Sequence, residues 1–514
     1  MLLHLFIFLA LVSGSASGQV FPRASDGKPD LQGIWRPVNR ASFDLEDHVA
    51  RHDMPAGISV VDGGTIPYLP WAAEQQIQNF NNRSSDDPLK NCYLPGVPRI
   101  MAMESPFQIF QTTNHIAITF EWQQVYRLIY TNGSPPLYAG IQSWMGNSRG
   151  HWEGDILVVD VIDQNNKTWL DAAGNFHSNE IHVTERYRLI DSDTIEYSAT
   201  IEDPNVFTRP WTIKLELKRQ EHMKGILEYQ CQAEKEEQNG DFERDENTWY
   251  PAPIPIDNEP FDANAGEDFP LPIITNDISR LSDGTPNISG YYMADAGGAN
   301  YGLEKHDREI LLPPSRGQVI DPVDGMLPYQ TWARAERINR QLPHRGYDDP
   351  TAHCFVGGIP RSHYVPAPFF ILQPPGYIVV LHERMSWRRI PLNSQHHLPD
   401  TIRLWQGHSF GHWEEDTLIV ESKNFNGKSW LNEVGDVVSH MQTVVETFTP
   451  VDENQIIYRA TVSDPIPYTR PWTIEMPFNQ ENEELLEVAC LEDNADLQHL
   501  KDVQDEYRKN QISE

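Results

Sequence analysis

Residues 143–159 read SWMGNSRGHWEGDILVV, and residues 404–420 read LWQGHSFGHWEEDTLIV. In each stretch a glycine-marked turn leads into a run of Val, Ile and Leu, which is typical of a β-strand. Other segments recur in the same order: DGKPDLQGIW (26–35) returns as DGTPNISGYY (283–292), and DPNVFTRPWTI (203–213) returns as DPIPYTRPWTI (464–474). The chain therefore contains two homologous domains of roughly 200 residues each.

Short strand-like segments follow one another through each half. In the first half they are FQIFQ (107–111), HIAITFEW (115–122), VYRLIYT (125–131), DILVVDVI (155–162), IHVTERYRLI (181–190), TIEYSATI (194–201), WTIKLELK (211–218) and ILEYQCQ (226–232). Consecutive strands with short connections favour an antiparallel meander. We therefore predict a mainly β protein with two tandem antiparallel, lipocalin-like β-barrels, each with room for one small ligand. A β-sandwich is the alternative.

Composition suggests where the domains begin and end. We assign residues 19–234 and 283–490 to the two barrels, and the acidic, Pro-rich residues 235–282 to a linker. Residues 1–18 have the apolar run and small residues of a secretory signal peptide, which predicts a secreted or periplasmic protein. Residues 491–514 form a polar tail with a predicted helix. No other segment is long and apolar enough to suggest a membrane span.

The formal net charge of −34 limits the range of partners. Phosphate-rich nucleic acids and anionic membranes favour basic surfaces, so neither is an expected partner. The charge fits either solubility or cation binding. A small-molecule ligand is the expected partner, and nothing in the sequence indicates an oligomeric state.

Four cysteines occupy equivalent places in the two halves. Cys92 matches Cys354, and Cys231 matches Cys490. In an exported protein this symmetry predicts one disulfide per domain, Cys92–Cys231 and Cys354–Cys490. Metal binding by cysteine is the weaker alternative, because the chain has no C-x-x-C pair.

A group of acid–base candidates comes from the strands of the first half. Glu185 shares one strand face with apolar residues, so it is either paired with an arginine (Arg127, Arg209, Arg389 or Arg470 across the two halves) or a general acid. The G-H-W-E segment adds His151, and the following strand adds Asp160. Together with His182 and Arg186 on the opposite face, these residues form the predicted catalytic set.

Residues that differ between the halves are the better functional candidates, because residues kept in both serve the shared fold. His177, His182 and Arg186 belong to the first half alone, and the two histidines suggest an alternative zinc site. The second half has its own histidines at His363, His382, His396, His397 and His408, whose counterparts are Met101, Phe120, Pro135, Pro136 and Asn147. Ligand binding is assigned to His177, His397 and the aromatic side chains Trp144 and Trp152.

The motifs PDLQGIW, SRGHWEGD-x-LVVD, H-V-x-E-R and T-R-P-W-T resemble a large family of uncharacterised exported bacterial proteins, here in tandem duplication. The resemblance implies secretion and a β-rich domain, and it names no reaction. Members usually read Y-A-C-H-E-G-N at the last cysteine, whereas this chain reads Y-Q-C-Q-A-E-K and V-A-C-L-E-D-N.

Three functions remain open. The favoured one is a cofactor-free acid–base enzyme (a hydratase, isomerase, cyclase or lyase) that acts on an apolar or sugar-like molecule in or between the barrels. The first alternative is a non-catalytic carrier of a hydrophobic or glycan ligand. The second is a histidine-dependent metalloenzyme. The chain lacks the G-x-S-x-G, Walker and H-E-x-x-H motifs, so those enzyme classes have no support.

Overall fold

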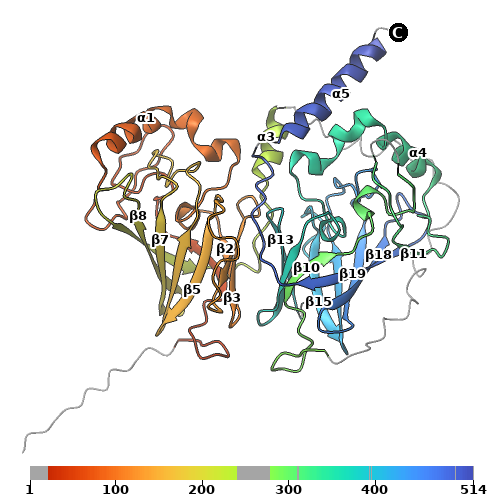
Figure 1. The fold of residues 1–514 in the computed structure, drawn as a ribbon, viewed down its shortest axis with the longest axis horizontal. Helices are drawn as coiled ribbons and strands as arrows, with labels where there is room; N and C mark the ends of the chain where they lie inside the picture. Colours follow the sequence, from red (N-terminus) through yellow and green to blue (C-terminus); the bar gives the residue numbers. More distant parts are fainter. Residues whose placement is uncertain are drawn as a thin grey trace, which may run out of the picture.

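A computed structural model describes residues 21–239, 278–308, 312–392, 394, 396–492 and 494–512. Within this part of the chain two β-barrels stand side by side, as predicted (Figure 1). The proposed signal peptide and most of the proposed linker lie outside the described residues. Among the described helices, none has the length and apolar character needed to cross a membrane.

Nine strands close the first barrel. They are β1 (Gly33–Pro37), β2 (Phe107–Gln111), β3 (His115–Phe120), β4 (Tyr126–Tyr130), β5 (Asn147–Glu153), β6 (Ile156–Ile162), β7 (His182–Asp191), β8 (Thr194–Glu202) and β9 (Trp211–Arg219). Each strand pairs with the next in the sequence, and β1 closes the barrel by pairing with β9. The pairs are antiparallel except β4 and β5, which run parallel and meet at Tyr130 and Arg149. Strands β1 and β5 were not among the predicted strands. Strand β1 lies in a segment punctuated by Pro and Gly, and β5 (NSRGHWE) has no β-branched residue.

The second barrel repeats this arrangement and is nearly closed. Its strands are β10 (Gly290–Ala294), β11 (Val319–Asp321), β12 (Phe369–Leu372), β13 (Tyr377–His382), β14 (Ser386–Pro391), β15 (His408–Glu414), β16 (Thr417–Lys423), β17 (Thr443–Pro450), β18 (Gln455–Ser463) and β19 (Trp472–Glu481). Strand β10 takes the role of β1 and pairs with β12 and β19. A parallel bridge between Leu392 and Gly411 lies at the seam where β14 meets β15.

The barrels pack together through the outer faces of strands that are apolar on both sides. Phe110 and Ala117 of the first barrel share one buried cluster with Phe370 and Leu381 of the second. This contact explains why β12, with the sequence FFIL, reads as a continuous apolar run, since a strand covered on both faces has no polar side. The Trp387 indole N–H also donates to the Phe120 carbonyl at 3.0 Å across the contact.

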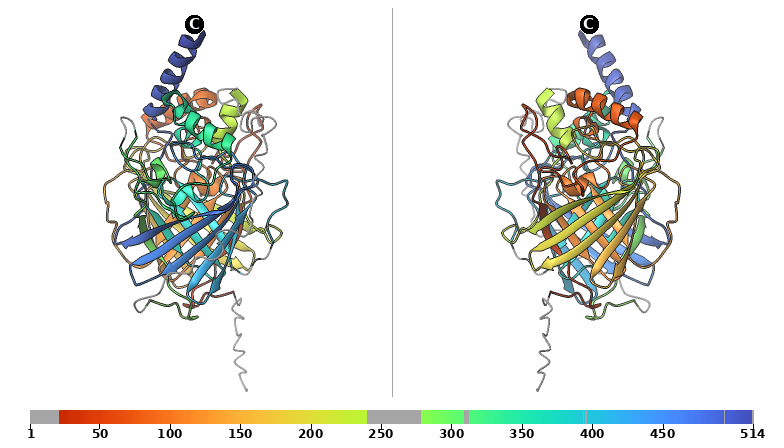
Figure 2. Two further views of the ribbon diagram at one scale, coloured as in Figure 1. Left: turned by 90° about the vertical axis from the view of Figure 1, so that its right-hand side faces the viewer. Right: turned by 90° about the vertical axis from the view of Figure 1, so that its left-hand side faces the viewer.

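Helices gather at one end of both barrels (Figures 1 and 2). The α-helices are α1 (Pro70–Asp86), α2 (Arg99–Ala102), α3 (Cys231–Asn239), α4 (Thr331–Arg340) and α5 (Ala495–Ile512); the 3-10 helices are η1 (Pro88–Asn91), η2 (Ala299–Tyr301), η3 (Pro343–Asp348), η4 (Pro350–His353) and η5 (Arg361–His363). Helix α5 corresponds to the helix predicted in the polar tail.

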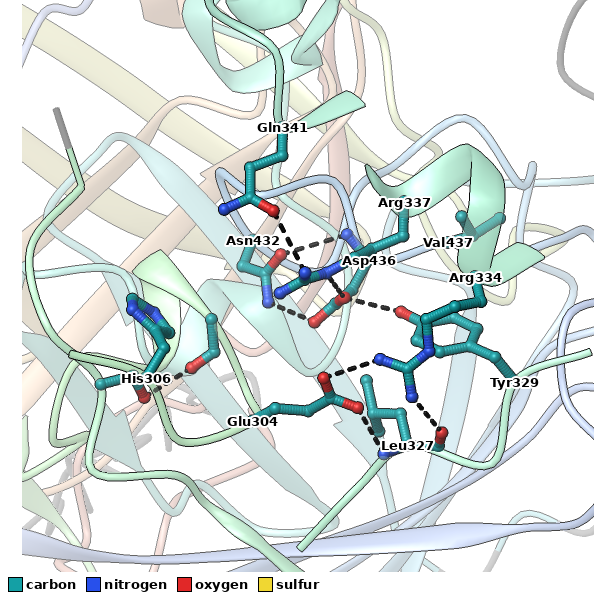
Figure 3. A network of polar contacts seen from close by, with 12 residues as sticks. Glu304, His306, Leu327, Tyr329, Arg334, Arg337, Gln341, Asn432, Asp436 and Val437 are labelled. Carbon is teal, nitrogen blue, oxygen red and sulfur yellow. Dashed lines mark hydrogen bonds and ion pairs between the residues drawn. The ribbon is translucent and has the colours of Figure 1, made fainter. Parts of the chain in front are cut away.

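A buried polar network fixes α4 to the second barrel (Figure 3). The Asp436 carboxylate, in the loop between β16 and β17, accepts hydrogen bonds from Tyr329 at 2.6 Å and from Arg337 of α4 at 3.3 Å. Asn432 also donates to this carboxylate, at 2.6 Å. Arg334 of the same helix pairs with Glu304 at 2.8 Å. These side chains bond to one another, so we interpret the network as an anchor for the helix.

Each barrel extends a segment onto the other after its last strand. In the first segment, residues 224–230, the Glu228 carboxylate accepts from the backbone N–H groups of Trp405 and Gln406 at 2.5 and 3.1 Å. In the second, residues 483–489, Glu487 accepts from the backbone N–H groups of Trp144 and Met145 at 2.7 and 2.9 Å. We call these segments the first and second straps. The strand predicted at 226–232 is wrong, because this segment forms only an isolated bridge, from Tyr229 to Trp122 of its own barrel, while Glu228 bonds to the other barrel.

Each strap leads into a cysteine that returns the chain to its own barrel. The disulfides are Cys92–Cys231 and Cys354–Cys490, which confirms the predicted pairing. The two straps and two disulfides thus cross-connect the barrels in the same way from both sides.

Candidate functional site between the barrels

The predicted acid Glu185 lies inside the first barrel in a complete ion pair. Its carboxylate accepts from Arg127 at 3.0 and 2.5 Å and from the Tyr197 hydroxyl at 2.8 Å. Glu185 has no exposed surface. The geometry thus supports the interpretation that Glu185 is paired with Arg127, while Arg209 bonds its neighbouring Pro210 carbonyl on the surface.

The second barrel contains the equivalent pair, but with a different arginine from the one predicted. Glu446 binds Arg388, whereas Arg389 donates to the Lys224 carbonyl and Arg470 pairs with Asp321. The turn between β13 and β14 has three residues where the first barrel has four. This difference shifts the register by one residue, so Arg388 rather than Arg389 points inward.

The remaining predicted catalytic residues lie on the outside of the first barrel. His182 contacts Asp160 at 3.1 Å, and Arg186 donates to Glu153 at 2.7 Å. His151 contacts the same Glu153 at 3.5 Å. Because successive strand residues point to opposite faces, this surface group is separated from Glu185 by the sheet itself. The acid–base cluster expected from His151, Asp160 and Glu185 therefore does not form.

The predicted ligand-binding residues are also dispersed. Trp144 is buried between the barrels and donates its indole N–H to Glu492 at 2.8 Å. Trp152 packs against the first core, next to the Lys28 ammonium. His177 is buried and its Nδ1 contacts the Ser178 carbonyl at 2.8 Å, while His397 lies against the Phe410 ring. Of these four, Trp144 lines a cavity.

Two histidines of the second half form a buried polar chain beside the Arg388–Glu446 pair. Ser386 Oγ lies 3.3 Å from His382 Nδ1, and His382 Nε2 lies 3.4 Å from His363 Nδ1. His363 Nε2 then lies 3.4 Å from Glu446 Oε1. The chain runs from the start of β14, across β13 and η5, to β17. It is a continuous set of contacts from a hydroxyl to a carboxylate.

The ring hydrogens of this chain can be placed consistently. When His363 donates to Glu446, His382 donates to His363 and Ser386 donates to His382, so that Nδ1 of His382 is a proton acceptor. The opposite arrangement is also available, because Arg388 Nη1 lies 3.2 Å from His363 Nε2 and can donate to it. The hydrogen bonds of this polar chain can therefore all point toward Glu446 or all point toward Ser386.

The first barrel contains no such chain at the equivalent positions. Met101 stands where the second barrel has His363, Phe120 stands in place of His382, and Val125 lies opposite Phe120 as Ser386 lies opposite His382. All three of these residues belong to the apolar core. The barrel fold thus does not require the polar chain, which makes it a candidate for function.

His382 and Ser386 line a cavity of about 100 Å³ between the barrels. Both disulfides contribute to its wall. Apolar side chains supply much of the remainder, including Leu94, Trp144, Phe355 and Val488. A neighbouring cavity of about 190 Å³ lies against the second strap and shares Met385 with the first. For comparison, a dry apolar cavity of about 150 Å³ is large enough for benzene.

Burial sets the protonation states of His382, His363 and Glu446 in this polar chain. It lowers the pKa of His382 well below 6.5, and the nearby His363 and Arg388 contribute in the same direction. Burial also lowers the pKa of His363. For Glu446 burial acts upward, but the Arg388 charge and the hydrogen bonds from His363 and Arg388 bring its pKa to about 2. At neutral pH the chain thus holds two neutral imidazoles next to an ionised carboxylate, and a neutral imidazole is able to accept a proton.

Sequence comparison of the halves singles out His363 and His382, but Ser386 has no signal of its own. Its role depends on its place opposite His382 across the short turn, which only the paired strands reveal. No cluster of three or more metal-binding side chains occurs among the described residues.

No family model matches this chain, and a search of characterised proteins found no relative.

Proposed function

We propose that the protein binds a small, mainly apolar molecule in the cavity between the barrels and catalyses cofactor-free acid–base chemistry on it. The observation that carries this proposal is the position of His382, a buried residue with a neutral imidazole that is part of the cavity wall. Because burial disfavours the cationic form, this imidazole is unprotonated at neutral pH and has a free lone pair that can accept a proton. The two disulfides support the further proposal that the protein is exported, since disulfides persist in oxidising compartments.

His382 acts as the base in this proposal, and His363 and Glu446 are positioning residues. When His382 takes a proton from the ligand, it becomes a cation inside the barrel. Its Nε2–H then points at His363, which in turn points at the Glu446 carboxylate. The charge that develops is thereby stabilised through two hydrogen bonds, in a region of low dielectric where such interactions are strong.

A carrier without catalysis is the second candidate, and the apolar lining of the cavity favours it. Trp144, Phe355 and the apolar residues of the second strap would bind a hydrophobic group whether or not His382 reacts. The two candidates differ in one outcome, which is turnover of a molecule that reacts by losing a proton.

The test uses 5-nitrobenzisoxazole, a small apolar molecule whose ring opens to a coloured phenolate when a base removes its ring C–H proton. We expect the wild-type protein to catalyse this reaction and H382F to lose at least about 100-fold in kcat/KM, the range for a positioned base. H115F is the matched control, since His115 is half-buried against Phe370 of the other barrel and lines neither cavity. Binding with no turnover by the wild type would favour the carrier.

A further inference from the structure

We propose that Ser386 is a catalytic nucleophile and that the cavity between the barrels hydrolyses small esters with an apolar acyl group. This inference rests on the proposed function, because His382 is the base in both. It goes further in naming a covalent step and a substrate class.

Ser386 lies at the point where a nucleophile can reach both the base and the cavity. It begins β14 and is the register partner of His382 across the turn Glu383-Arg384-Met385. Ser386 is part of the cavity wall although it is only 6% exposed. The preceding Met385 has a φ of +48°, a left-handed conformation that is uncommon for a residue with a side chain. The short turn thus places Ser386 directly opposite the imidazole.

The polar chain behind Ser386 has the order of a nucleophile, a base and a group that orients the base. In serine enzymes the base accepts the hydroxyl proton at one ring nitrogen, and its other nitrogen donates to an acceptor that fixes its orientation. Here His382 Nδ1 faces Ser386 and Nε2 faces His363, which connects to Glu446. The carboxylate therefore acts through one additional imidazole.

Packing alone does not explain these groups. The first barrel fills the three equivalent positions with Met101, Phe120 and Val125, all of which belong to its core. Placing two imidazoles and a hydroxyl inside a barrel has a desolvation cost that the apolar residues avoid. Departures from apolar packing inside a core are typical of functional sites.

The chemical step balances without a cofactor. Ser386 Oγ attacks the ester carbonyl carbon, and its proton moves to His382 Nδ1. The bond from that carbon to the alcohol oxygen then breaks, and the alcohol leaves with the proton from His382. Water next attacks the acyl group on Ser386 and gives its proton to His382, which releases the carboxylic acid and returns the hydroxyl to Ser386.

The cavity indicates the size and character of the acyl group. A volume of about 100 Å³ with walls from Leu94, Trp144 and Phe355 fits a short apolar chain rather than a polypeptide. The Gln230 side chain lines the same cavity, and its Nε2 has no hydrogen-bond partner among the described residues. This buried N–H group is a donor available to a carbonyl oxygen.

The experiment uses the full-length protein with p-nitrophenyl butyrate and a fluorophosphonate that labels nucleophilic serines. We expect wild-type turnover, a single label located at Ser386 by peptide mass spectrometry, and loss of both in S386A. The loss of kcat/KM for the ester should be at least about 100-fold. S148A is the matched control, because Ser148 is a buried serine in the first barrel that bonds Arg127.

Two assays distinguish the nucleophile Ser386 from the base His382. S386A should lose ester turnover and labelling but keep 5-nitrobenzisoxazole turnover well above that of H382F, because the base His382 remains. Ester turnover or labelling that persists in S386A would overturn the nucleophile while leaving the base in place. A wild-type protein that neither hydrolyses the ester nor takes the label at Ser386 would also overturn it. Loss of 5-nitrobenzisoxazole turnover in S386A would assign Ser386 to positioning of His382 instead.

Discussion

Replacing the polar chain with the residues of the first barrel should make the protein less sensitive to acid. The triple variant H363M/H382F/S386V installs at each position the side chain that the other half already uses. The substitutions match a core that folds, so the variant should fold. It should also lose 5-nitrobenzisoxazole turnover, because no base remains at the cavity.

The size of the effect follows from the lowered pKa values of His363 and His382. In the unfolded chain each histidine has a pKa near 6.5 and binds a proton as the pH falls below that value, whereas the buried imidazoles stay neutral. Since the unfolded state then binds more protons, wild-type stability is lost as the pH falls below about 6.5. Two imidazoles that are fully neutral in the folded state set an upper limit of roughly 3 kcal/mol at pH 5.5 and almost nothing at pH 7.5.

The assay is urea unfolding of wild type and variant at pH 7.5 and 5.5 with the disulfides intact. The barrels can unfold in separate transitions, and the effect belongs to the second. Other groups with shifted pKa values, such as His177 and Asp171, are present in both proteins and cancel in the comparison. Arg388 and Glu446, which face the histidines, are also unchanged. Equal pH dependence of the two proteins would refute the burial argument.

Three further predictions concern the pairings that hold the barrels. Burial raises the pKa of Glu487 to about 7, so this group makes the folded protein less stable as the pH rises from about 4.5 to 7. E487Q should therefore remove roughly 2–3 kcal/mol of the difference in stability between pH 5 and pH 8. An unchanged difference in urea unfolding would count against this prediction. R127M leaves Glu185 buried without its cation and should lower the free energy of unfolding by about 3–5 kcal/mol. The double variant R127M/E185Q should recover part of this loss. A decrease of less than about 1 kcal/mol in R127M would contradict the pairing. The cysteines of the Cys92–Cys231 disulfide are 139 residues apart, so its removal should lower the free energy of unfolding by about 4–5 kcal/mol. The disulfide can be removed by reduction and alkylation or by C92S/C231S. A thermal midpoint equal to that of wild type would show that the barrel does not depend on this disulfide.

Seven of the nine strands of the first barrel were predicted because their signal is local. Alternation of buried and exposed residues in β7 and β8 follows from sequence spacing alone, and the duplication supplied the disulfide pairing. The unpredicted β1 and the misassigned strap at 226–232 share one cause. Their structure is decided by partners far away in the sequence, which for Glu228 are backbone groups of the other barrel.

The candidate site was predictable only in part for the same reason. Comparing the halves identified His363 and His382 as residues that the fold does not need. It could not place Ser386 opposite His382, because that depends on a turn one residue shorter than its counterpart. The set of His151, Asp160 and Glu185 failed because strand parity puts Glu185 inside the barrel and the other two outside.

The most direct test of the account is the pH–rate profile of 5-nitrobenzisoxazole opening by wild type, H382F and H115F between pH 5 and 8. A buried, neutral His382 predicts a rate that stays high well below pH 6.5 and disappears in H382F but not in H115F. A profile that falls through pH 6.5, the ordinary histidine value, and is unchanged in H382F would place the base on the protein surface and contradict the assignment of the cavity.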